Sequence, residues 1–169
     1  LPEEKRKIPD QITTYRVDVN WLNSNIDFKI IYDDSVLGYT NYYHEVCPKG
    51  VHYVKTYTGV TYKNIYNGID LHYYEKGGVL KYDYIVAPYS NYKQIQLEIK
   101  GAEKITLQKD GLILIKTKLG SIIEDLPVVY QNRKQLKATW KVKNNILSFE
   151  VREYDPRYTL LIDPAVRIW

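Results

Sequence analysis

The sequence lacks methionine and contains a single cysteine, Cys47, among its 169 residues. One cysteine cannot form a disulfide within the chain, so the fold has to be stabilised by its apolar core. A chain of this length buries roughly 70% of its unfolded surface on folding, which makes one domain without disulfides feasible. Because no start methionine is present, we expect the chain to be a processed piece of a longer protein.

Long apolar runs and blocks of like charge are also missing. No stretch approaches the ~20 apolar residues of a membrane-spanning helix, and the opening segment LPEEKRKIPDQ is too polar for a signal peptide. The 24 basic and 20 acidic residues leave a formal charge of +4 and are interspersed along the chain. Since a nucleic-acid groove usually needs a clustered basic face, we expect neither nucleic-acid binding nor membrane insertion.

Recognisable enzyme motifs are absent as well. The sequence has no glycine-rich phosphate loop, no Gly-x-Ser-x-Gly elbow and no His-Glu-x-x-His pair. The soft metal ligands are His44, Cys47, His52 and His72, and only His44-x-x-Cys47 has the tight spacing of a zinc ligand pair. We interpret them as loop histidines and a buried thiol. We therefore predict no catalytic residue, no metal and no cofactor.

What the sequence does contain is a two-residue apolar rhythm. In NYKQIQLEIKG, Ile95, Leu97 and Ile99 alternate with polar residues, which is typical of a strand with one buried face. Turn signals such as Asp110-Gly111 and Asn144-Asn145 separate successive runs of this kind. No window of 11 or more residues has helical spacing. We predict an all-β fold: an antiparallel β-sandwich-like domain built of consecutive hairpins.

The N-terminal half follows this rhythm less closely. The segments TTYRVDVNWL and IDFKIIYDDS predict two strands. Between Val36 and Tyr62 the pattern weakens into a tyrosine-rich region punctuated by glycine and proline. We expect irregular loops there.

Tyrosine is concentrated in one part of the chain, since fourteen of the eighteen tyrosines lie between Tyr32 and Tyr92. Cross-strand packing explains much of this content, because broad rings pack well on a pleated sheet. On an open face the same rings would stack on sugars or anchor a protein partner. The candidate ligand- or partner-binding residues are Tyr42, Tyr43, Tyr66, Tyr73, Tyr74, Tyr89 and Tyr92, together with Trp21 or Trp169 if exposed.

Several short runs occur in a fixed order along about the last two-thirds of the chain. They are YKNIY at 62–66, GIDL at 68–71, YDYIVAP at 82–88, PVVYQ at 127–131 and LIDP at 161–164, preceded by NYY at 41–43. With these runs the chain resembles an uncharacterised domain near the N-termini of large exported bacterial proteins, especially in the Bacteroidetes. In those proteins the domain often precedes β-propeller-type SBBP repeats. Tyr89-Ser90-Asn91 departs from the Gly-Ala-Asp that the family tends to have after the proline.

The resemblance implies a cellular context and no chemistry. Such proteins are secreted or displayed at the cell surface, often through the type IX system with a separate C-terminal signal, and the family offers no catalytic residues to carry over. The resemblance also suggests how the chain is divided. We predict a single β-rich domain over 1–169, with a less regular part at 1–61, a β core at 62–164 and the start of a linker at 165–169.

These observations lead to one functional prediction and two alternatives. We predict a non-catalytic structural or adhesion module of a secreted or cell-surface protein, which contacts other domains of the same polypeptide or other surface proteins. The first alternative is a carbohydrate-binding module with a tyrosine stacking platform for glycans. The second is a hydrolase that uses carboxylates such as Asp70 and Asp83 near His72.

Overall fold

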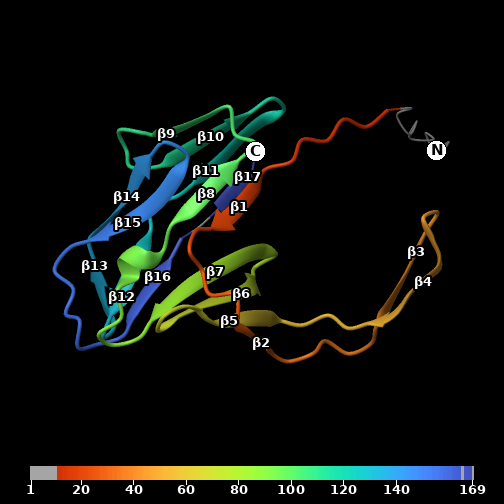
Figure 1. Ribbon diagram of the computed structural model, residues 1–169, viewed down its shortest axis with the longest axis horizontal. Coiled ribbons are helices and arrows are strands. Elements are labelled where there is room, and N and C mark those ends of the chain that lie inside the picture. Colours follow the sequence, from red (N-terminus) through yellow and green to blue (C-terminus); the bar gives the residue numbers. More distant parts are fainter. Residues whose placement is uncertain (1–10, 165, 169) are drawn as a thin grey trace, which may run out of the picture.

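The computed structural model describes residues 11–164 and 166–168, and it confirms the all-β prediction. Within these residues the regular elements are strands, apart from a single turn of 3-10 helix, η1 (Tyr92–Gln94). The strands form three antiparallel sheets and a separate hairpin (Figure 1). No helix in the described part of the chain is long and apolar enough to cross a membrane.

The largest sheet has seven strands. Three consecutive hairpin strands form one half of it, turned at Asn67-Gly68 and Gly77-Gly78 as the sequence predicts. The C-terminal β16 lies between β7 and β12, so the sheet joins segments far apart in the sequence. In spatial order the strands are β13 (Lys134–Leu136), β12 (Val128–Gln131), β16 (Leu160–Asp163), β7 (Val79–Val86), β6 (Ile69–Lys76), β5 (Gly59–Tyr66) and β2 (Lys29–Tyr32).

Two four-stranded sheets lie over one face of the seven-stranded sheet (Figure 1). The first contains β1 (Asp18–Trp21), β8 (Leu97–Lys100), β15 (Ile146–Val151) and β14 (Ala138–Lys143). The second contains β17 (Val166–Ile168), β11 (Gly120–Glu124), β10 (Ile113–Thr117) and β9 (Lys104–Leu107). Residues 166–168, which the sequence places in a linker, thus pair with β11, whereas Ala165 and Trp169 lie outside the described residues.

A single apolar core fills the space between the large sheet and the two smaller ones. The predicted alternation is confirmed, because Ile95, Leu97 and Ile99 are all buried in this core. Trp140 packs on Phe149 with ring centroids 4.5 Å apart, and its indole Nε1 donates a hydrogen bond to the carbonyl oxygen of Asp125 at 2.7 Å. The sandwich-like arrangement follows from this burial, since each sheet covers the apolar face of the other.

The expectation of irregular loops between Val36 and Tyr62 is wrong. This region contains β3 (Thr40–His44) and β4 (Cys47–Val54), which pair with each other, and it then enters β5. The hairpin projects from the ends of β2 and β5, away from the three sheets (Figure 1). We refer to residues 33–58, the hairpin and its two stems, as the arm. Its strands bury neither face in the core, so they lack the apolar alternation that marks a half-buried strand.

Candidate functional site: a projecting arm with exposed tyrosines

Large apolar side chains are exposed along the whole arm. They are Val36, Leu37, Tyr39, Tyr42, Tyr43, Val46, Val51, Tyr53 and Tyr57. An isolated two-stranded hairpin is at best marginally stable in water, because it has no core of its own. Exposed apolar clusters of this kind are typical of interaction sites.

Local contacts arrange the aromatic rings of the arm. The ring of Tyr39 lies 4.9 Å from that of Tyr53, and the ring of Tyr43 meets that of His52 edge-on at 5.3 Å. The Tyr43 ring also lies over Gly50, where a Cβ would come within 2.8 Å of it. Gly50 has φ of +71°, a conformation that favours glycine, so this position both turns the strand and leaves room for the ring.

The stems of the arm are attached to the seven-stranded sheet by backbone hydrogen bonds and one side-chain pair. The backbone N–H of Asp33 donates to the carbonyl oxygen of Gly59 at 3.0 Å. On the outer face, Nε2 of His72 lies 2.8 Å from Oδ2 of Asp33. A Cβ on Gly59 would lie 2.9 Å from Nε2 of His72, so the missing side chain makes room for this pair. The arm therefore leaves the sheet from a defined base.

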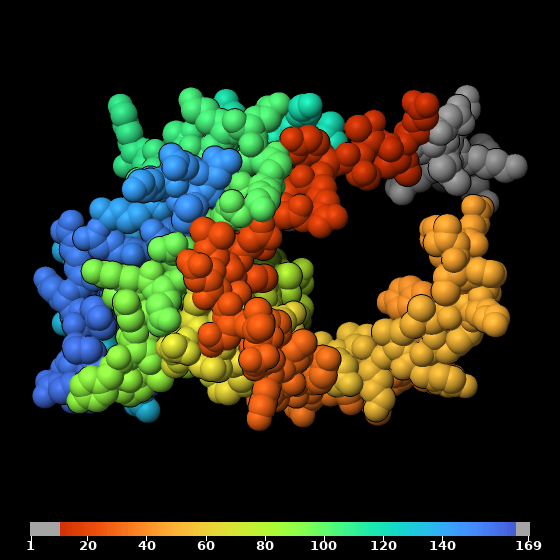
Figure 2. Space-filling view, viewed as in Figure 1, coloured from red at the N-terminus to blue at the C-terminus, as the bar shows by residue number. Residues whose placement is uncertain are grey.

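A groove of about 370 Å³ lies beside this base. The rings of Tyr32 and Tyr57 stack along it with centroids 4.6 Å apart and an interplanar angle of 28°. Tyr62 and Tyr73 continue the aromatic lining toward the interior of the protein. Figure 2 shows wide open space between the arm, in orange and yellow, and the sheets.

The seven tyrosines predicted as binding residues lie in different environments. Tyr42 and Tyr43 are on β3 in the arm, with 58% and 67% of their surfaces exposed. Tyr89 is 78% exposed but lies away from the arm, where its backbone N–H donates to the carbonyl oxygen of Pro156. Only Tyr42 and Tyr43 therefore belong to the arm surface.

The other four predicted tyrosines are partly or fully buried. Tyr66 and Tyr92 are each 2% exposed, and their hydroxyl groups bind the backbone of Gln96 and Val151 inside the body. The adjacent Tyr73 and Tyr74 face opposite sides of β6: Tyr73 faces the inner side, whereas Tyr74 stacks on His72 at 5.1 Å. Tyr66 and Tyr92 are therefore core residues and offer no surface to a partner.

Four exposed tyrosines of the arm and its base were not among the seven predicted binding residues, although three of them lie in the region from Val36 to Tyr92, whose exposed tyrosines the sequence analysis favours as a contact surface. These are Tyr32, Tyr39, Tyr53 and Tyr57. They lie in the tyrosine-rich region noted in the sequence, but nothing in their local spacing separates them from core tyrosines. Trp21 is not an exposed platform either, because it packs against the core and its Nε1 donates a hydrogen bond to the hydroxyl of the buried Tyr84 at 2.9 Å.

The potential metal ligands do not converge. His44 and Cys47 are cross-strand partners at the hairpin end of the arm, and Cys47 is exposed, so the prediction of a buried thiol is wrong. His44, His52 and His72 lie in strands and not in the expected loops. Among residues 11–164 and 166–168, no group of three or more His, Cys, Asp or Glu side chains could hold a metal ion.

The carboxylates of the hydrolase hypothesis have structural partners. Asp70 accepts hydrogen bonds from the Lys63 side chain and from the backbone N–H of Asn64, the latter at 2.8 Å. Asp83 is the cross-strand partner of His72. Burial, and secondarily the charge of Asp163, raises the pKa of Asp83. Asp70, Asp83 and His72 lie on the outer face of the sheet, and none of the three lines the groove beside the arm.

Comparison with known proteins identifies one family. A family model described as a domain of unknown function, DUF7948, matches residues 2–165. No curated protein and no solved structure matches the chain. The family match agrees with the expectation of an uncharacterised domain.

Proposed function

The chain belongs to the DUF7948 family of domains of unknown function, and we propose that it is a non-catalytic structural or adhesion module that binds other protein domains through its arm. The observation that carries this proposal is the projection of an apolar, tyrosine-rich hairpin from an otherwise complete core. The setting of the proposal, a secreted or cell-surface protein of several domains, rests on the sequence resemblance.

The geometry of the rings on the hairpin favours a protein partner over a glycan. Rings that stack on sugars lie side by side in a shallow groove next to polar groups, whereas Tyr39 and Tyr53 are tilted by 54° and Tyr43 and His52 by 75°. Tyr42 and Tyr43 are consecutive in β3, so they point to opposite faces of the hairpin. A protein partner that surrounds the arm contacts both faces at once, and buried tyrosines are common anchors of such interfaces.

The backbone of the arm supports the same conclusion. β3 and β4 form a two-stranded sheet, so the outer edge of each strand pairs with no other described strand. Unpaired edges bind additional strands readily, and natural proteins usually protect them. An additional strand from a partner would satisfy these backbone groups while its side chains cover the tyrosines.

Hydrogen exchange measured by mass spectrometry tests this proposal. The isolated chain is compared with the same chain inside its full parent polypeptide. We expect amides of 40–54 to exchange rapidly in the isolated chain and at least tenfold more slowly in the parent, whereas amides of β6 are protected in both. Equal exchange of the arm in the two proteins would contradict contact with a domain of the parent.

A matched pair of variants identifies the contact residues and separates the glycan alternative. Tyr42→Ser/Tyr43→Ser changes the arm, and Tyr89→Ser/Tyr130→Ser changes two tyrosines outside it that are also exposed. We expect amides 40–54 of the parent polypeptide to lose their protection from hydrogen exchange in the arm variant only. A glycan array probed with the wild-type chain should give no specific signal. A specific signal that the arm variant loses would instead support the carbohydrate-binding alternative.

A further inference from the structure

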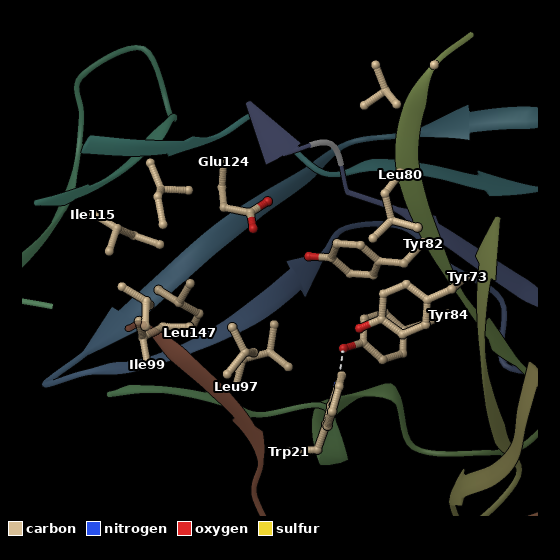
Figure 3. Close-up of a pocket in the computed structure, with 15 residues that line it drawn as sticks. Trp21, Tyr73, Leu80, Tyr82, Tyr84, Leu97, Ile99, Ile115, Glu124 and Leu147 are labelled. Atoms are coloured by element: carbon tan, nitrogen blue, oxygen red, sulfur yellow. Dashed lines mark hydrogen bonds between the residues drawn. The ribbon is translucent and has the colours of Figure 1, made fainter. Parts of the chain in front are cut away.

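An apolar cavity of about 470 Å³ lies between the seven-stranded sheet and the two smaller sheets (Figure 3), and the exposed side chains of Val19, Val79 and Leu80 form part of its lining. Trp21, Tyr82 and Tyr84 line one part of it, and Leu97, Ile99 and Leu147 line another. Small-molecule sites usually have volumes of roughly 300–1,000 Å³ and mostly apolar walls with a few polar groups. The size and lining of this cavity fall within that class.

A single carboxyl group, that of Glu124, lines the cavity among the described residues. Ile122 and Glu124 alternate with Ser121 and Ile123 along β11, so both point inward. Oε2 of Glu124 is buried and has no hydrogen-bond partner in the described part of the chain. Buried polar atoms in folded proteins are nearly always paired, so an orphaned oxygen beside an open volume indicates a missing partner.

Two phenols share this environment. Figure 3 shows the hydroxyl of Tyr82 pointing toward Glu124 from the opposite wall, with Tyr73 beside it. Neither hydroxyl has a hydrogen bond among the residues described, in contrast to Tyr84, which accepts from Nε1 of Trp21. Burial raises the pKa of both phenols, so they stay neutral. Burial also raises the pKa of Glu124 to about 8, which leaves its carboxyl group protonated at neutral pH.

We propose that this cavity binds a small apolar molecule with one neutral hydroxyl head, of the class of medium-chain alcohols. The tail lies against Leu97, Ile99 and Leu147, and the head exchanges hydrogen bonds with Glu124. A ligand with an ammonium head group requires Glu124 to be ionised in an apolar wall. A ligand with a carboxylate head group places a second acid beside Glu124. Both arrangements bring desolvated charge into the cavity, which costs more than a neutral hydrogen bond.

Binding of 1-decanol to the intact chain, followed by isothermal titration calorimetry at neutral pH, tests the proposal. Decyltrimethylammonium and decanoate serve as charged probes with the same tail. We expect saturable one-to-one binding of the alcohol, with an affinity at least tenfold higher than that for either charged probe. No saturable binding of 1-decanol, or equal affinity for a charged probe, would overturn the proposal.

Variants of Glu124 locate the site. Glu124→Leu should weaken 1-decanol binding about tenfold, because one hydrogen bond to the head is lost. Glu124→Gln keeps a neutral polar group and should stay within about threefold of wild type. The matched control is Glu98→Leu, since Glu98 lies on β8 between two cavity residues but does not line the cavity. If Glu98→Leu weakened 1-decanol binding as much as Glu124→Leu, or if Glu124→Leu left the binding unchanged, the assignment of Glu124 as the head-group ligand would be contradicted. Near-UV circular dichroism verifies that each variant is folded.

Discussion

Replacing Glu124 by glutamine removes an ionisable group from the wall of the apolar cavity, and we expect this change to alter how the free energy of unfolding depends on pH. The carboxyl group has a pKa of about 8 in the folded protein, against a reference value of 4.5, chiefly because burial penalises its charged form. The charge of the neighbouring Asp125 adds to this effect. Glutamine has nearly the same shape but cannot ionise.

The direction follows from proton binding in the two states. Between pH 4.5 and about pH 8 the unfolded chain has released the Glu124 proton, whereas the folded protein retains it. The contribution of Glu124 to the free energy of unfolding is therefore fully present below pH 4.5 and is lost as the pH rises toward the pKa of Glu124 in the folded state. The slope is about 1.4 kcal/mol for each pH unit in this window, and the total reaches on the order of 5 kcal/mol.

Urea unfolding of both proteins across this window measures the effect, with tryptophan fluorescence as the signal, to which the buried Trp140 contributes. The unfolding free energy of wild type minus that of Glu124→Gln should fall by about 2.5 kcal/mol from about pH 5.5 to about pH 7.5. Glu98→Gln is the control, because hydrogen bonds from Asn20 and Lys100 lower the pKa of Glu98 and leave it ionised throughout. Parallel curves for wild type and Glu124→Gln would refute the assignment of a buried, neutral carboxyl group.

Three further substitutions test the packing of the body, each by chemical denaturation followed by far-UV circular dichroism. Trp140→Ala should cost about 3–5 kcal/mol, because the indole is 1% exposed and packs on Phe149 in the core. Gln131→Ala should cost about 2–4 kcal/mol, since the buried amide donates to the carbonyl oxygens of Asp155 and Tyr158 and accepts from the N–H of Asp155. Gly68→Ala should cost about 1–3 kcal/mol, because φ is +71° and a Cβ would overlap Ser90, and adding Ser90→Gly should recover part of the loss.

The local parts of the fold could be predicted from the sequence. Alternation at Ile95, Leu97 and Ile99, and turns at Asn67-Gly68 and Asn144-Asn145, depend on neighbours in the chain, and the structure confirms them. Pairing between distant segments could not be predicted in the same way. Strand β16 lies between β7 and β12, and β1 pairs with β8. The sequence does not predict these pairings, because the backbone hydrogen bonds of a strand do not specify which partner strand it finds.

The candidate sites depend even more on tertiary structure. Glu124 follows two isoleucines in SIIEDLP and lies three residues before Pro127, so the sequence alone is compatible with an ordinary polar strand end. Its carboxyl group becomes buried because the seven-stranded sheet packs over β11. The strands of the arm could not be predicted for a different reason. Both faces of the hairpin are exposed, so its sequence has no alternation of apolar and polar residues to detect.

The tyrosines show how one residue type serves both packing and recognition. Along the inner face of the large sheet, neighbouring rings are in contact from Tyr84 through Tyr82 and Tyr73 to Tyr62, with centroid distances of 5.9, 5.6 and 6.1 Å. Tyr84 is fully buried beneath the smaller sheets, whereas Tyr32, further along the same face, is 55% exposed. The two tyrosines differ in exposure because the smaller sheets cover Tyr84, whereas no described strand lies over the base of the arm. A partner that covers this base would therefore bury tyrosine surface in the same way that the smaller sheets bury it in the core, which is why we place the contact there and along the arm.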